Sequence, residues 1–375
     1  MDSCATVSRA WKTREGSQRD SEKVVGRSPC ADQDQWLSAD SRVVLLGERP
    51  VSSLEQLPYI LCDVMKHREL EVVIVGGGLA GLSAAIYLGR ARRKPMLIHS
   101  GRSMAKWEPE VQNYLGFPDG IDGSDLLHRG MKQAGKFHVE IVHDDIQSLQ
   151  QNEQGFELVG ECHRYLAQRV LIATGLTHLP PNIPGVEECL GHSLFFCKDC
   201  DAYRVQGKRI VILGCNNEAA DYALAMLLFS PSVTICTNGQ TPIWDSSHRA
   251  WLMEYQVMIH KERIQTVEHE QGQIMALRFD SGASLNIEAA FVTRGDICHS
   301  DLVKSVGVEL TTDGQIVVDD CLRTSVPNLY AAGCVTTANC QMIIAAGQGA
   351  IAAQAINRDL FEEALAEHRL PLWAD

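Results

Sequence analysis

The chain has 375 residues, of which 45% are hydrophobic and 22% are charged, and its formal net charge is −13. This length suits two domains with an appendage, and the composition is that of a globular protein rather than a disordered one. The acidic charge argues against nucleic-acid binding, no run approaches the roughly 18 apolar residues of a membrane-spanning helix, and the first residues lack the apolar core of a secretory signal.

The cysteine content indicates the redox compartment. The chain has 13 cysteines. An odd number of cysteines in a chain that is not a small secreted scaffold predicts mostly reduced thiols. We therefore expect a cytoplasmic protein.

Residues 1–68 differ in composition from the rest of the chain. They mix Ser, Arg, Asp and Gln, with little apolar periodicity. Because such a segment can bury little apolar surface, we expect a flexible or loosely packed N-terminal extension.

A βαβ unit is predicted after the extension. Residues 71–75 form a short apolar run, which is typical of a strand buried on both faces. A glycine-rich turn follows at 76–81, then a helical pattern at 82–88 and a second strand at 95–98. The order of strand, glycine turn, helix and strand indicates a nucleotide-binding unit.

The glycines of this turn stand where a dinucleotide site needs them. Gly76 permits a tight turn, Gly78 lets the backbone approach a pyrophosphate, and Gly81 allows the helix to pack closely on the strand. The following helix N-terminus offers free N–H groups and a positive dipole end to the phosphates.

The same arrangement recurs later in the chain. A buried strand is expected at 209–213, a turn at 214–219, a helix at 220–229 and another strand at 233–236. We infer two doubly wound domains of the α/β class. Three further buried strands are expected at 170–173, 290–292 and 329–331.

Cys197 and Cys200 form a C-x-x-C pair upstream of the second turn. If the pair opens a helix, the helix dipole lowers a thiol pKa and provides a nucleophilic thiolate. A zinc site is an alternative, because Cys189 and His192 would complete four ligands within a short stretch. Two inert thiols are the third interpretation.

From about residue 70 to 364 the chain resembles the low-molecular-weight thioredoxin reductases, a family of FAD-dependent disulfide oxidoreductases. The matching segments follow in the family's order: 75–81, 113–118, 173–175, 197–201, 214–219, 326–333 and 345–349. The resemblance favours the redox interpretation of the C-x-x-C pair over zinc.

The resemblance implies a discontinuous FAD domain around a central domain. Residues 69–186 and 296–375 would form the FAD domain, and 187–295 the central pyridine-nucleotide-like domain that carries the C-x-x-C pair. A homodimer is implied as well.

The resemblance also implies roles for individual residues. Cys200 would exchange electrons with the flavin, Cys197 would exchange with a partner disulfide, and Asp201 would protonate the leaving thiolate. The partner would be a thioredoxin-like protein or a small dithiol. The residues implied in FAD binding are Gly76, Gly78, Gly81, Asn113, Gly175, Gly333, Cys334 and Gln341, with Gln341 beside the flavin ring.

The second nucleotide turn departs from the family pattern. Asn216 replaces its middle glycine and would crowd a pyrophosphate. Residues 236–242 carry no Arg or Lys, whereas NADPH-dependent members place an arginine cluster there to bind the 2′-phosphate. We expect NADPH to be a poor candidate for the electron donor, and Asn216 argues against NADH too.

The segment before the last helix departs as well. Cys334 stands where the family has Asp, and Cys340 stands where it has Arg. We favour two buried apolar thiols here. The alternative is that one of them joins the electron path near the flavin.

Two subgroups of the family lack the NADPH signature, and this chain resembles both in that loss. They are the ferredoxin-dependent flavin thioredoxin reductases and the diflavin-linked disulfide oxidoreductases, which hold a second FAD. Other functions also stay open: a dithiol oxidase that uses oxygen, a non-enzymatic redox-sensing flavoprotein, and a zinc-stabilised nucleotide-binding module.

Overall fold

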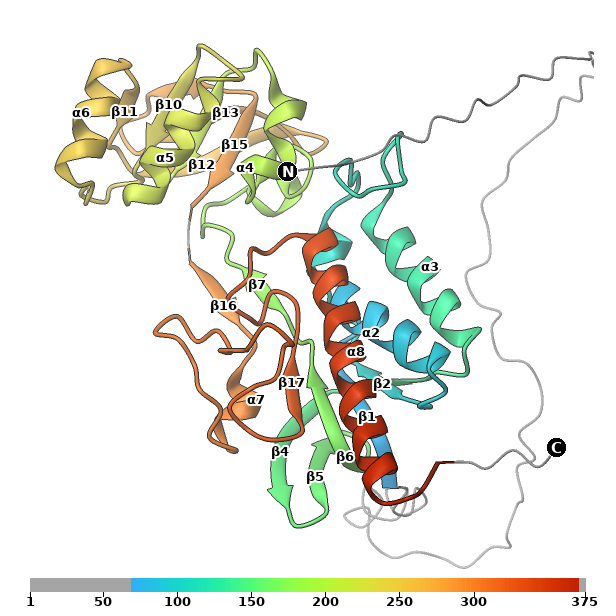
Figure 1. Cartoon of the computed structure of the whole chain (residues 1–375). Coiled ribbons are helices and arrows are strands. Elements are labelled where there is room, and N and C mark those ends of the chain that lie inside the picture. Colours follow the sequence, from blue (N-terminus) through green and yellow to red (C-terminus); the bar gives the residue numbers. More distant parts are fainter. Residues whose placement is uncertain (1–68, 294, 371–375) are drawn as a thin grey trace, which may run out of the picture. The chain divides into compact units, whose positions relative to one another are not determined.

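A sheet built mainly from parallel strands organises the first and last parts of the chain in this computed structural model, which describes residues 69–293 and 295–370 (Figure 1). Its order is β3-β2-β1-β6-β5-β4, and β17 pairs with β6. The strands are β1 Glu69–Val75, β2 Met96–His99, β3 Glu140–His143, β4 Ile146–Asn152, β5 Gly155–Gly160, β6 Arg164–Ile172 and β17 Leu329–Ala331. The strand β17 enters beside β6 from the far end of the chain, so this sheet is discontinuous in sequence.

A second sheet is formed by residues that lie between β6 and β17 in sequence. Its order is β11-β10-β9-β15-β8, and all of its pairs are parallel. The strands are β8 Leu194–Phe195, β9 Ile210–Leu213, β10 Val233–Cys236, β11 Met258–His260 and β15 Ala289–Val292. An antiparallel sheet accompanies it, made of β12 Ile264–Glu270, β13 Gln273–Phe279 and β14 Ser284–Asn286.

Helices and two short connecting strands complete the described elements. The α-helices are α2 Leu79–Arg90, α3 Gly123–Gly135, α4 Lys198–Asp201, α5 Asn217–Met226, α6 Ser246–Glu254, α7 Asp301–Lys304 and α8 Met342–Ala366. The 3-10 helices are η1 Met104–Trp107, η2 Glu187–Cys189 and η3 Ala202–Val205. The connecting strands β7 Leu176–His178 and β16 Asp296–Cys298 pair in antiparallel fashion. All described residues belong to one compact unit.

The core follows from the apolar strand runs. Every residue of β9, β10 and β15 is buried, and Val72, Val73 and Ile74 in β1 have no exposed surface. Strands of this kind need cover on both faces, which the α/β architecture supplies.

Small residues allow α2 and α8 to lie side by side (Figure 1). A Cβ atom on Gly349 would lie 2.0 Å from the backbone oxygen of Ala80, so only glycine fits at this crossing. The close packing of α8 on α2 therefore depends on the Ala/Gly-rich start of α8.

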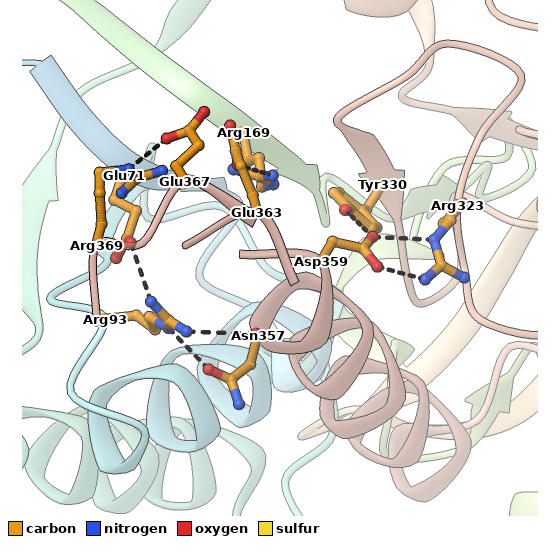
Figure 2. A network of polar contacts seen from close by, with 10 residues as sticks. All are labelled: Glu71, Arg93, Arg169, Arg323, Tyr330, Asn357, Asp359, Glu363, Glu367 and Arg369. Carbon is orange, nitrogen blue, oxygen red and sulfur yellow. Dashed lines mark hydrogen bonds and ion pairs between the residues drawn. The ribbon is translucent and has the colours of Figure 1, made fainter. Parts of the chain in front are cut away.

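A polar network anchors the C-terminal half of α8 to the first sheet (Figure 2). Asp359 receives two hydrogen bonds from Arg323, at 2.6 and 3.0 Å, and one from the hydroxyl of Tyr330, at 2.5 Å. Glu363 pairs with the buried Arg169 of β6 at 2.6 Å. Charge-assisted bonds of this geometry fix the helix, and thereby the position of its first turn.

The expected α/β fold class with two doubly wound domains is confirmed by these sheets and by the family relationship reported below. The second predicted helix starts earlier than expected: α5 begins at Asn217 rather than 220, because the side chain of Asn216 caps it. The predicted domain bounds 69–186, 187–295 and 296–375 stay predictions. The expected extension 1–68 lies outside the described residues. No helix within those residues is long and apolar enough to cross a membrane.

Candidate active site

The first glycine turn is shaped for the backbone to approach a ligand. Gly76 has a φ of 121°, and a Cβ there would lie 2.1 Å from the backbone oxygen of Ala173. A Cβ on Gly81 would lie 1.9 Å from the backbone oxygen of Gly76. These two glycines are therefore required by packing alone.

Gly78 differs from its neighbours in the turn. The only atom near a Cβ built there is the Ser103 hydroxyl oxygen, at 3.8 Å. Gly78 is the N-cap of α2 and makes no side-chain cap, so the first N–H groups of the helix have no side-chain acceptor at the cap. Such an uncapped helix end beside open space fits a pyrophosphate.

The predicted FAD glycines follow the ends of β1, β6 and β17. Gly175 follows β6, has a φ of 70°, and has no atom within 4 Å of a Cβ built on it. Gly333 follows β17; its N–H donates to the Gln348 side chain at 2.7 Å, and a Cβ there would lie 2.9 Å from that of Ala80. The carboxyl ends of parallel strands are where nucleotide sites form in this architecture.

Cys197 and Cys200 form a disulfide with Cα atoms 5.3 Å apart. Cys197 is the N-cap of the short helix α4, and its sulfur accepts a hydrogen bond from the N–H of Cys200 at 3.2 Å. An N–H aimed at a sulfur stabilises the thiolate that forms on reduction.

The zinc alternative gains nothing from the geometry around the pair. Cys189 is buried, its thiol donates to the backbone oxygen of Gly185 at 3.3 Å, and burial raises its thiol pKa to about 11. Within 69–293 and 295–370, no group of three or more His, Cys, Asp or Glu side chains could hold a metal ion.

Gln341 lies against both sulfurs of the pair. Its amide nitrogen is 3.2 Å from the Cys197 sulfur and 3.3 Å from the Cys200 sulfur. Its amide oxygen accepts a hydrogen bond from the side-chain nitrogen of Asn113 at 3.2 Å. Gln341 is the N-cap of α8, so the anchored helix carries this amide. The structure thus brings together Cys197, Cys200, Asn113 and Gln341 from three separate segments.

Asp201 is buried beside the pair. Its carboxylate bonds to the guanidinium of Arg204 at 2.9 Å. Burial raises the pKa of Asp201, and Arg204 opposes that rise. A buried carboxyl with a raised pKa can hold a proton at higher pH than an exposed one, as a general acid must.

Glu108 is a further acid of this region that sequence reasoning missed. Its pKa is raised to about 7, first by burial and then by the charge of Asp201, while Arg204 and His178 lower it. No motif marks Glu108, because the shift depends on side chains brought together only by the fold.

The second glycine turn is closed by the chain itself. The Asn216 side chain accepts from the N–H of Ala219 at 3.1 Å and so caps α5. The N–H of Ile243 donates to the backbone oxygen of Cys215 at 2.8 Å, and Cys215 also contacts the Gln240 side chain at 3.1 Å. Residues 240–243 therefore lie against the turn, and the cap takes an N–H that a pyrophosphate would use.

The N-termini of α5 and α6 are also hydrogen-bonded to each other. Asn217 donates to the Asp245 carboxylate at 3.0 Å and accepts from the Asp245 N–H at 2.9 Å. A carboxylate at this position repels phosphate. The turn between β9 and α5 thus has an N–H of its first helical turn capped by Asn216 and a carboxylate beside its helix N-terminus.

Basic residues from another segment lie near residues 236–242. Residues 236–242 carry no basic residue, but the loop after β11 approaches them. The Gly239 N–H donates to the backbone oxygen of Lys261, and a Cβ on Gly239 would lie 3.5 Å from that of Arg263. Two exposed cations thus flank the end of β10, contributed by a segment that the linear spacing does not reveal.

Cys334 and Cys340 are not the buried apolar thiols that the sequence favoured. They form a second disulfide, with Cα atoms 4.8 Å apart. Cys334 is half-buried and Cys340 is exposed. The Thr336 N–H donates to the backbone oxygen of Gly333 at 2.9 Å, and this turn bends the chain so that the two cysteines meet.

Comparison with known proteins shows which family this chain matches. A family model described as pyridine nucleotide-disulphide oxidoreductase matches residues 70–353. A thioredoxin reductase of Treponema pallidum is 28% identical over 309 residues, covering 76% of this chain and 96% of that protein. The NADPH-dependent thioredoxin reductase 3 of Arabidopsis thaliana is 29% identical, covering 77% of this chain and 58% of that protein.

A solved structure agrees with these relatives. The crystal structure of HlmI is 27% identical and superposes with a TM-score of 0.75, covering 80% of this chain and 95% of that chain. The redox pair, the first glycine turn and the family model lead to one conclusion. This chain belongs to the pyridine nucleotide-disulphide oxidoreductase family and is a thioredoxin reductase-like, FAD-dependent disulfide oxidoreductase.

Proposed function

We propose that the chain transfers electrons between FAD and a thioredoxin-like protein or small dithiol through the Cys197–Cys200 pair, with a donor other than NADPH. The observation that carries the proposal is the contact of Gln341 with both sulfurs. The family resemblance implies that Gln341 lies beside the flavin ring. The same side chain would therefore touch the disulfide and border the cofactor.

The first turn fits FAD. Gly76, Gly78 and Gly81 would admit the pyrophosphate to the N-terminus of α2, where Gly78 leaves open space. Gly175 and Gly333 would line the same edge of the sheet. When bound, FAD supplies an acceptor and donor of electron pairs for the disulfide.

The protein's own groups would then carry the exchange with the partner. The Cys197 thiolate attacks the partner disulfide, and Cys200 resolves the mixed disulfide, so the partner leaves as a dithiol and the pair is oxidised. The Cys200 N–H stabilises the Cys197 thiolate. Asp201 gives a proton to the departing sulfur, because its burial keeps that proton available.

NADPH does not fit the second turn. The Arabidopsis relative is named for NADPH, but here the Asn216 cap and the Asn217–Asp245 pair take the polar groups that a pyrophosphate would need. Lys261 and Arg263 could meet a 2′-phosphate, yet the phosphates beside α5 would face Asp245. Two donors then remain, reduced ferredoxin and a second FAD, and reduced ferredoxin is the one that the titration below tests.

Anaerobic titration of the holoprotein tests the donor. NADPH, NADH and reduced ferredoxin are added in turn while the flavin absorbance is recorded. The proposal predicts bleaching by reduced ferredoxin and none by the pyridine nucleotides. Rapid bleaching by NADPH would overturn it, and oxygen consumption with a small dithiol would favour a dithiol oxidase.

A further inference from the structure

We propose that Cys334 and Cys340 form a second redox-active disulfide, which exchanges directly with the reduced Cys197–Cys200 pair. This inference rests on the proposed function, since that function supplies the reduced first pair. Each chain would then have two dithiol/disulfide pairs, each able to store two electrons.

The position of the second disulfide carries the argument. Cys340 immediately precedes Gln341, whose amide nitrogen contacts both sulfurs of the first pair at 3.2 and 3.3 Å. The two disulfides are therefore joined by one peptide bond and one side-chain contact.

The second disulfide is also accessible. Cys340 and Asn339 are exposed, and residues 337–340 lie in no helix or strand. In contrast, Val335 and Thr336 have no exposed surface. Opening the bond therefore frees the exposed half of the segment and leaves the buried half in place.

A purely bracing role is poorly supported. The bond closes a loop of sequence separation 6, and short loops give the smallest constraint on the unfolded chain. Hydrogen bonds already fix the start of the segment: Thr336 donates to Gly333, and Ile316 donates to Val335 at 2.8 Å. These hydrogen bonds hold the buried start of the segment in addition to the covalent bond.

A free thiol lies beside the second disulfide. The Cys298 thiol donates to the backbone oxygen of Val335 at 3.6 Å, so a thiol lies beside the segment without joining a disulfide. Cys321 is also a thiol.

The exchange balances in atoms and electrons. The Cys197 thiolate attacks the exposed Cys340 sulfur; the Cys334–Cys340 bond breaks, and Cys334 leaves as a thiolate that takes a proton. The Cys200 thiol then loses its proton and attacks the Cys197 sulfur, which restores the first disulfide. Cys340 leaves and is protonated. Two electrons and two protons pass from the first pair to the second.

Trapping the intermediate tests the step. The Cys200→Ser holoprotein keeps the attacking thiol but lacks the resolving one. After acid quench, alkylation and proteolysis without reductant, we expect a peptide pair linked through Cys197 and Cys340, with Cys334 alkylated. Full retention of the Cys334–Cys340 link, with Cys197 alkylated throughout, contradicts the proposed route through Cys197.

A rate measurement decides the question independently of that variant. Wild-type and Cys197→Ser/Cys200→Ser holoproteins receive one equivalent of dithiothreitol without oxygen, and alkylation reports the second pair over time. We expect that pair to be reduced at least about 10-fold faster in the wild type, because the first pair relays electrons. Equal rates mean direct attack by the reagent and overturn the inference. Cys298→Ser is the matched control, with the wild-type rate expected.

The outcome separates this inference from the proposed function. Flavin that responds to the first pair, together with a second pair that never exchanges, would overturn only the inference. Exchange between the pairs without any flavin response would overturn only the proposed function.

Discussion

The amide nitrogen of Gln341 lies 3.2 Å from the sulfur of Cys197, although 144 positions separate the two residues in the sequence. The contact joins the N-cap of α8 to the N-cap of α4. Because Asp359 and Glu363 anchor the other end of α8, the sheet network sets where this amide stands (Figure 2).

Replacing Gln341 by Glu is expected to raise the thiol pKa of the reduced pair and so lower its thiolate fraction. A carboxylate against the two sulfurs repels a developing thiolate and raises its pKa. We expect alkylation of the reduced pair at pH 7 to slow about 10-fold, which corresponds to roughly one pKa unit. Rates measured against pH check this shift. Gln112→Glu, at an exposed position, is the control, and an unchanged alkylation profile in Gln341→Glu would refute the contact's role.

The raised pKa of Glu108 makes stability depend on pH. Its pKa of about 7 exceeds the ordinary 4.5, so the folded state binds a proton that the unfolded state has released across that interval. This contribution is fully present below about pH 4.5 and is lost as pH rises through about 7, by up to about 3 kcal/mol. Urea unfolding of wild type and Glu108→Gln across this range measures it. The free energy of unfolding should fall less steeply with rising pH in Glu108→Gln than in the wild type. The same pH dependence in both proteins would show that the pKa of Glu108 is not raised.

Two glycines of the first turn provide a matched pair. Gly81→Ala places a Cβ 1.9 Å from a backbone oxygen and should prevent stable folding, whereas Gly78→Ala meets nothing closer than 3.8 Å. The Gly78 variant should therefore fold but retain less FAD, since its methyl group enters the pyrophosphate path. Circular dichroism and bound-flavin content separate the two effects. A Gly78→Ala protein with full flavin content would argue against FAD at this turn.

The Asn216 cap has a predicted stability contribution. Asn216→Ala leaves the Ala219 N–H without its acceptor and should lower the free energy of unfolding by about 1 kcal/mol. Asn216→Asp preserves the cap and should change stability little, because Asn and Asp are similar N-caps. Denaturant titration compares the variants. Equal stability of the Ala and Asp variants would mean that the cap contributes nothing.

The nucleotide units could be predicted from sequence because their signals are local. Strand β1 is a continuous apolar run before a glycine turn, and burial on both faces of the sheet requires that pattern. The sequence pattern predicts the start of α5 too late, because Asn216 stands at a glycine position of the turn and its role as a helix cap depends on the fold. The same residue defines both the cap and the closed turn.

Features formed by distant segments could not be predicted in this way. Lys261 and Arg263 lie close to Gly239 because they follow the neighbouring strand of the sheet, although they are distant from Gly239 in sequence. The raised pKa of Glu108 comes from burial, which spacing does not encode. The bond between Cys334 and Cys340 depends on the turn at Thr336, and two cysteines six residues apart are otherwise free to stay thiols.

Electron exchange between the Cys197–Cys200 pair and bound FAD underlies both the proposed function and the further inference. Its most direct test is the anaerobic flavin absorbance of purified wild type and of Cys197→Ser/Cys200→Ser during addition of dithiothreitol. We predict a yellow wild type that bleaches and a yellow variant that does not. A colourless wild type, or a variant that bleaches as fast as the wild type, would contradict the claim.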